Sequence, residues 1–180
     1  MANQHEGYYT LRSGITLYPP QNKAISQALD NLTHKIPAHF ILLTDVTGQI
    51  ISTRGEQNDI DLIALGSLMA GDLAASQEIA RLTGEYQDYQ MILREGTQMH
   101  TFISEAGRYL ALLVQAAKEV PLGWARVIIR KAAQEITDIV ANPPQEAKQP
   151  DLAEQLDSML TEEDELPDLF SDALDELWTK

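Results

Sequence analysis

Residues 59–82 read DIDLIALGSLMAGDLAASQEIARL, and this segment is the most informative part of the sequence. Large apolar residues recur at helical spacing, at Leu62, Leu65, Met69 and Leu73. That stripe predicts a long helix that covers a sheet. Between these positions the segment is rich in Ala, Gly and Ser. A glycine inside a helix costs about 0.5–1 kcal/mol relative to alanine, so two glycines in one helix need a structural reason.

Small residues stand four apart on this helix, as in Gly66 with Ala70 and Gly71 with Ala75. This spacing lets a second backbone approach closely, so the helix is expected to have two neighbours. One is the sheet. The other is either a further part of the same chain or the same helix of a second subunit across a two-fold axis. We favour the second subunit.

The segments before this helix predict a helix and a β-hairpin. Asn22 is the expected N-cap of a first helix, which Pro37 ends. His39–Thr44 is apolar and β-prone, and the turn Asp45–Gly48 leads into a second strand at Gln49–Thr53.

After the long helix, Gly84 is the expected stop, and three strands follow between Tyr86 and Val114. The first two alternate and are expected to show one face to water. Tyr109–Val114 is almost wholly apolar and is expected to be central. Pro121 then opens a last helix. The order predicts an α+β fold, a five-stranded antiparallel sheet with flanking helices.

This arrangement resembles the Roadblock/dynein light chain domain, with the layout of bacterial MglB-like regulators. The resemblance rests on Phe40–Asp45, the Gly48 hairpin, the Ala/Gly-rich helix, the meander that ends at Leu110–Val114, and Leu122–Arg126. It implies a homodimer with paired long helices and joined edge strands at Tyr86–Glu95. It also implies an MglA-type, Ras-like small GTPase as partner. The dimer-interface residues carried over are Gly66, Ala70, Gly71, Ala74, Tyr89 and Met91.

Composition limits the classes of function. The 180 residues carry 13 Lys and Arg against 27 Asp and Glu, a formal charge of −14, which argues against nucleic acid as a partner. No apolar run is long enough to insert into a membrane, and no signal peptide is recognised, so we expect a cytoplasmic protein. There is no cysteine, and the four histidines lack the spacing of metal ligands, so neither a metal nor a cofactor is expected.

Most of the negative charge lies in residues 141–180, which hold 12 acids and two lysines. We divide the chain into an N-terminal arm (1–21), a Roadblock-like domain (22–141) and an acidic tail (142–180). The tail carries apolar residues at helical spacing, which predicts an amphipathic helix that binds a partner or inhibits its own dimer. These residues are Leu166, Leu169, Phe170, Leu174, Leu177 and Trp178.

Catalytic patterns are not recognised. The segment Asp45–Gly48 matches the D-x-x-G of GTPases, but no phosphate-binding G-x-x-x-x-G-K-[ST] accompanies it. The favoured interpretation is therefore a non-enzymatic regulator or scaffold of a small GTPase. Two alternatives stay open: a ligand sensor of the PAS or GAF type, which would need an internal pocket, and a dimeric adaptor that recruits an unrelated partner through its tail.

Overall fold

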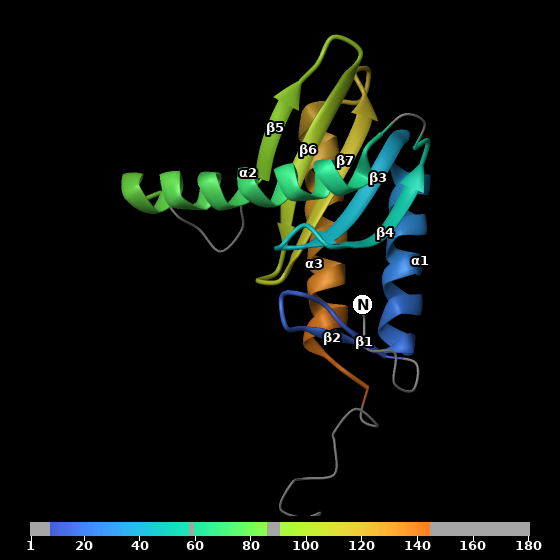
Figure 1. The fold of residues 1–180 in the computed structure, drawn as a ribbon. Coiled ribbons are helices and arrows are strands. Elements are labelled where there is room, and N and C mark those ends of the chain that lie inside the picture. The colour runs from blue at the N-terminus through green and yellow to red at the C-terminus, as the bar shows by residue number, and fades with distance from the viewer. Residues whose placement is uncertain (1–7, 58–59, 86–90, 145–180) are drawn as a thin grey trace, which may run out of the picture. The chain divides into compact units, whose positions relative to one another are not determined.

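The computed structural model describes residues 8–57, 60–85 and 91–144, and shows a five-stranded antiparallel sheet with helices on both faces (Figure 1). The strand order is β4-β3-β7-β6-β5, so the apolar strand β7 is central, as predicted. The α+β fold class is confirmed. The elements are β1 (Tyr9–Thr10), β2 (Thr16–Leu17), α1 (Pro19–Lys35), β3 (Ala38–Asp45), β4 (Ile50–Gly55), α2 (Leu62–Thr83), β5 (Met91–Glu95), β6 (Met99–Ala106), β7 (Leu110–Ala117) and α3 (Leu122–Ala141).

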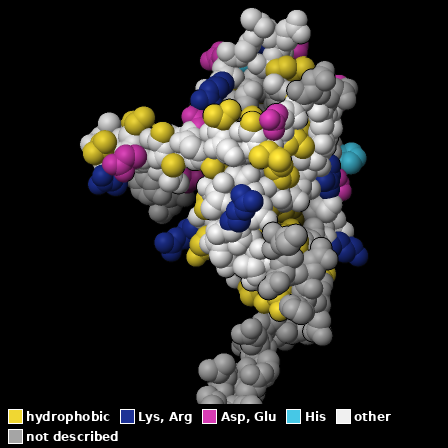
Figure 2. Space-filling view, in the orientation of Figure 1, with side chains coloured by type: hydrophobic (Ala, Val, Ile, Leu, Met, Phe, Trp, Pro, Cys, Tyr) yellow, Lys and Arg dark blue, Asp and Glu magenta, His cyan; other side chains and the backbone are white. Residues whose placement is uncertain are grey.

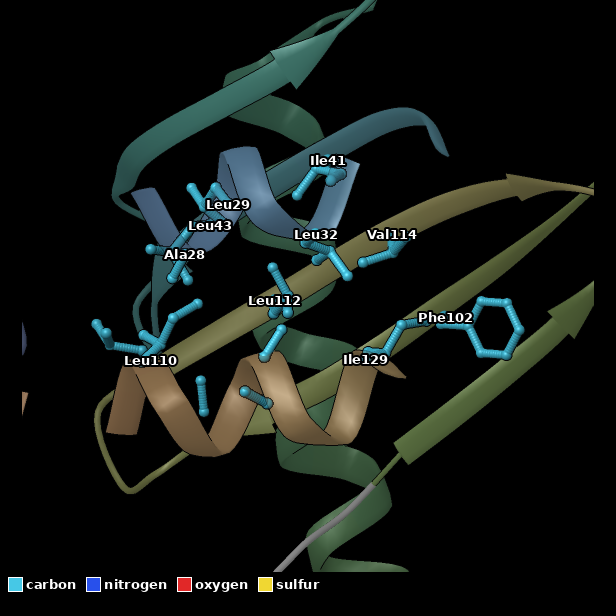
Figure 3. Packing of buried hydrophobic residues seen from close by; sticks show 14 of the residues in the cluster. Ala28, Leu29, Leu32, Ile41, Leu43, Phe102, Leu110, Leu112, Val114 and Ile129 are labelled. Atoms are coloured by element: carbon cyan, nitrogen blue, oxygen red, sulfur yellow. The ribbon is translucent and has the colours of Figure 1, made fainter. Parts of the chain in front are cut away.

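The sheet separates two apolar layers. On one face α1 and α3 pack side by side against β3, β6 and β7, and Figure 3 shows Leu29 of α1, Leu112 of β7 and Ile129 of α3 in this layer. On the other face α2 lies across the strands, and Met69 and Leu73 pack against Leu42 and other residues of the sheet. The stripe predicted for the long helix therefore does cover the sheet. Burial of these side chains is the main stabilising term of the fold.

The second of the three strands after α2 is β6, and the prediction that one of its faces meets water is wrong for most of its length. Every residue from Phe102 to Ala106 is buried, and only the first part of the strand is partly open. The reason is that β6 is covered twice, by α3 on one face and by α2 on the other. An alternating pattern indicates a strand with one buried face, whereas both faces of this strand are covered by helices.

The start of the first helix differs from the predicted one. Helix α1 begins at Pro19 rather than after Asn22, because proline is well suited to the first turn, where no backbone N–H is needed. Helix α2 is capped by Asp61, whose carboxylate accepts a hydrogen bond of 3.0 Å from the Ala64 N–H. Its end is as predicted, with Gly84 in the left-handed conformation (φ 74°).

Part of the N-terminal arm is a small β-hairpin, β1 paired antiparallel with β2. Leu11 and Leu17 are buried in the same core as α1 and α3. The backbone N–H of Ser13 donates to the Asp45 carboxylate at 3.0 Å, and that of Arg12 donates to Gln49 Oε1 at 2.8 Å. The hairpin thereby fastens onto the turn between β3 and β4.

Asp45 organises this turn with its carboxylate. Oδ1 accepts hydrogen bonds of 2.9 Å from the Thr47 and Gln49 N–H groups and of 2.7 Å from the Thr47 hydroxyl, while Oδ2 accepts the bond from Ser13. Burial alone would raise the pKa of the Asp45 carboxyl, but these hydrogen bonds outweigh it and hold that pKa below its ordinary value.

The same turn touches α2 through two glycines. Gly48 has φ 87°, and a Cβ built on it would lie 2.7 Å from the Gly66 carbonyl oxygen. A Cβ on Gly66 would lie 2.5 Å from the Gly48 carbonyl oxygen. Both distances are far inside van der Waals contact, so only glycine permits this approach. Gly66 therefore has a reason for being glycine within its own chain.

We predict that Gly66→Ala lowers the free energy of unfolding by about 1–3 kcal/mol, because the added methyl forces α2 away from the turn. Gly123→Ala in α3 is the matched control, since a Cβ there meets nothing within 4 Å and alanine favours the helix by about 0.5–1 kcal/mol. Urea unfolding followed by circular dichroism measures both. A stability of Gly66→Ala equal to or above that of the wild type would contradict the close contact.

We predict that Asp45→Asn lowers the free energy of unfolding at pH 7 by about 1–3 kcal/mol, because the amide places N–H donors against N–H donors. The folded-state pKa of Asp45 is depressed, so its stabilising contribution is complete above about pH 4 and is lost as the pH falls through the folded-state pKa. Urea midpoints between pH 7 and pH 2 should therefore fall less steeply in Asp45→Asn than in the wild type. Parallel curves would refute this role.

Candidate functional site

Helix α2 extends beyond the sheet that it covers. Its 22 residues span about 33 Å, whereas the outer strands of a five-stranded sheet lie about 19 Å apart. Figure 1 shows the C-terminal half of α2 projecting past β5. No residue of α2 after Leu73 is buried. We call residues 74–83 the overhang of α2.

The overhang and the outer side of α2 expose large apolar side chains. Ile79 is 63% exposed and Leu82 is 71% exposed, and Ile63 and Leu68 are similarly open near the other end of the helix. Figure 2 shows apolar side chains along the projecting helix. Soluble monomers rarely leave such a row uncovered, and a contiguous exposed apolar surface marks a site of protein interaction.

An apolar groove of about 560 Å³ runs beside α2 over the sheet. Leu65, Leu68 and Met69 of the helix form one wall, and Ile103 and Leu113 of the strands form the floor. The groove lies on the same face of the sheet as the overhang. It is therefore a second apolar surface that α2 itself does not fill.

An ion pair stands at the rim of this groove. The Arg94 guanidinium on β5 donates to the Asp72 carboxylate on α2, with Nη2 2.9 Å from Oδ1. This hydrogen bond raises the pKa of Arg94, which stays charged at all physiological pH values. The pair links β5 to α2, so the edge of the sheet and the helix form one continuous surface.

Strand β5 is the last strand of the sheet and is hydrogen-bonded to β6 alone among the described strands. Met91 at its start is half-buried and packs against the core beneath α1 and α3. An outer strand of this kind offers backbone groups for pairing with a further strand.

The predicted interface residues fall into different places. Gly71 and Ala74 are exposed, and Ala70 is half-buried at the side of α2. A Cβ on Gly71 would meet nothing within 4 Å, so the described residues give no reason for this glycine. Gly66 is buried against Gly48, so this glycine has a contact within its own chain, and its place near a dimer axis stays a prediction.

The other predicted residues lie outside the described part of the chain. These are Tyr89 of the predicted edge strand and the six tail residues Leu166, Leu169, Phe170, Leu174, Leu177 and Trp178.

Sequence reasoning missed the large apolar residues on the outer side of α2. Leu68, Ile79 and Leu82 are absent from the predicted interface, because that prediction uses only the small residues of the helix as its signal. A further signal was present: Leu68, Ala75, Ile79 and Leu82 follow at i, i+7, i+11 and i+14, on a stripe that is rotated away from the one facing the sheet.

Other kinds of site have little support in the described residues. Within residues 8–57, 60–85 and 91–144 there is no group of three His, Asp or Glu side chains that could hold a metal ion. In the same ranges no helix combines the length and apolar character that a bilayer span requires. The exposed apolar surface of α2 is therefore the strongest candidate site.

Comparison with solved structures adds to this geometry. The fold is similar to gliding protein MglB from Thermus thermophilus, with a TM-score of 0.63 and 25% identity over 69% of this chain and 94% of that one. It is also similar to Myxococcus xanthus MglB, with a TM-score of 0.59 and 34% identity over 64% of this chain and 93% of that one. The chain belongs to the MglB-type Roadblock family.

A Roadblock/LC7 domain from Streptomyces avermitilis shares the fold at 17% identity, with a TM-score of 0.57 over 64% of this chain and 97% of that one. No protein-family model matches the sequence, and no curated protein does. As a member of the MglB-type Roadblock family, the chain is a Roadblock-type regulator.

Proposed function

We propose that this protein is a non-catalytic, homodimeric regulator or scaffold that binds a small Ras-like GTPase of the MglA type in the cytoplasm. The observation that carries the proposal is the overhang of α2, whose apolar side chains have no partner among the described residues of one chain. Membership in the MglB-type Roadblock family supports it.

Two complementary surfaces on one face of the sheet support the proposed dimer. Each chain has an overhang that exposes Ile79 and Leu82, and a groove beside α2 that exposes Leu68. A two-fold axis near β5 would lay the overhang of each copy over the sheet of the other, which buries both surfaces in one step. Gly71 and Ala74, which are small and exposed, would then allow the two α2 backbones to approach.

The GTPase is proposed to bind to the surface formed by the two paired α2 helices of the dimer, which we call the two-helix deck. The resemblance of the sequence to Roadblock regulators implies this class of partner, and a rigid two-helix surface is able to hold one conformation of its switch loops. The arginines nearest to α2 do not suggest a catalytic contribution, since Arg81 binds Glu78 and Arg94 binds Asp72. The acidic tail, residues 142–180, is proposed as a partner-binding or autoinhibitory element.

The sensor alternative is less favoured. A PAS- or GAF-type sensor holds its ligand between the sheet and its helices. In this chain the space between the sheet and α1 and α3 is filled by buried side chains, among them Leu32, Leu43 and Phe102 (Figure 3).

We predict that Gly71→Glu combined with Ala74→Glu converts the dimer into a monomer, because two carboxylates would be buried at the closest approach of the helices. Light scattering after size exclusion should give twice the chain's 20.0 kDa for the wild type and 20.0 kDa for the double variant. Unfolding curves should show that the variant folds, since both positions are exposed in one chain. Gln27→Glu, exposed on α1, is the control and should leave the dimer intact. A dimeric double variant, or a monomeric wild type, would contradict the proposal.

We predict that an MglA-type GTPase loaded with a non-hydrolysable GTP analogue binds at least about tenfold more tightly than the same GTPase loaded with GDP. Calorimetric titration of the full-length protein measures both affinities. Gly71→Glu with Ala74→Glu should weaken the binding, because it removes the two-helix deck. Equal affinity for the two nucleotide states would leave a scaffold without regulation, and no binding at all would refute the GTPase as partner.

The same titration tests the tail. Deletion of residues 146–180 should weaken GTPase binding if the tail is part of the interface, and should strengthen it if the tail is inhibitory. Unchanged binding would rule out both roles for the tail in this interaction.

A further inference from the structure

A second exposed apolar site lies on α3, across the sheet from α2 (Figure 1). Trp124 is 44% exposed and Val127 is 51% exposed, and both stand in the first two turns of the helix. Ala125 and Ile129 are buried on the inner side of α3, so Trp124 and Val127 point away from the core. Trp124 therefore leaves nearly half of a large apolar side chain open to solvent.

The surroundings of these residues are positively charged. Between Leu122 and Gln134, α3 carries Arg126, Arg130 and Lys131 and no acidic residue; the first acid is Glu135. Lys131 and Glu135 also line a narrow groove of about 30 Å³ between α3 and α1, and Lys35 lines it from α1, so the two cations outnumber the one carboxylate there. In a chain with a formal charge of −14, a site with this excess of cations is chemically distinct from the rest of the sequence.

We call Trp124, Val127, Lys131 and Lys35 the α3 patch. Trp124, Val127 and Lys131 follow at i, i+3 and i+7 and so share one side of the helix. Trp is among the residue types enriched in the energetically dominant parts of interfaces. The patch thus places two exposed apolar side chains on the same side of α3 as Lys131, and Lys131 and Lys35 line the narrow groove beside them.

We propose that the α3 patch binds an acidic amphipathic helical segment of a partner protein. The apolar side of such a segment would cover Trp124 and Val127, and its carboxylates would pair with Lys35 and Lys131. Amphipathic helices commonly bind partner proteins through apolar residues at helical spacing. The proposal does not rest on the proposed function, since the sheet separates the α3 patch from α2 and both sites are accessible at once.

An anionic membrane or a nucleic acid is a poorer match for the same cations. Either would present a broad field of negative charge to a protein that itself carries 27 acids, and the repulsion extends over about 10 Å at ordinary salt. A single helical segment brings its charge only to the patch. The two exposed apolar residues are also too few to hold a protein on a lipid surface.

The experiment uses the full-length protein and a labelled synthetic peptide of about five helical turns. The peptide has Leu at i, i+3, i+4 and i+7 spacing and Glu at most other positions, and a scrambled peptide of the same composition is the reference. Fluorescence anisotropy measures affinity. We expect the amphipathic peptide to bind at least about tenfold more tightly than the scrambled one, and less tightly as salt is raised.

Variants test whether the peptide occupies the patch. Lys35→Gln with Lys131→Gln, and separately Trp124→Ala, should each weaken binding about tenfold or more. Lys23→Gln is the matched control, an exposed lysine at the other end of α1, and should bind as the wild type does. Circular dichroism melts establish that the variants are folded, which is expected because the changed side chains are exposed.

Three results would overturn the proposal. One is equal affinity for the amphipathic and the scrambled peptide. Another is wild-type affinity in both patch variants. The last is binding to phosphatidylglycerol vesicles that depends on Lys35 and Lys131 while the peptide does not bind, which would identify an anionic membrane as the occupant.

Discussion

The contact between the backbones of Gly48 and Gly66 determines where α2 lies, and the candidate surfaces depend on that placement. The turn between β3 and β4 holds the N-terminal part of the helix, and Asp45 holds the turn. Because α2 is anchored near one end and crosses the strands, its length carries the other end past β5. Apolar residues that would be covered in a shorter or differently inclined helix remain exposed there.

The two faces of the sheet present different chemistry to partners. On the α2 face, small and aliphatic residues such as Gly71 and Ile79 suit a close approach of another backbone. On the opposite face, α3 exposes Trp124 and carries Arg126, Arg130 and Lys131, which suits the acidic partner that we propose. Since the sheet and its two buried layers separate these surfaces, occupation of one does not block the other. A domain of this size can therefore act as a connector between two proteins, which is consistent with a regulator from the Roadblock family.

The elements that sequence reasoning located correctly are those whose signals are local. Strands β3 and β7 are short apolar runs, the turn at Gly48 has a glycine with positive φ, and the stripe through Met69 and Leu73 covers the sheet. Signals that need a distant partner were misread. The hairpin of β1 and β2 depends on Asp45, more than 30 residues away in sequence, so the arm carries no periodic pattern of its own. The burial of both faces of β6 depends on two helices that an alternating pattern does not reveal.

The order of helices and strands, the central place of β7 and the small-residue surface on α2 are encoded locally, because they follow from periodicity and turn chemistry within a few residues. Which glycine serves which contact is a property of the folded chain. Gly66 and Gly71 stand on the same helix in similar surroundings of sequence, yet Gly66 meets the backbone of Gly48 and Gly71 meets none of the described residues. That difference arises from the direction in which α2 crosses the sheet, and such a direction is a property of packing between distant segments.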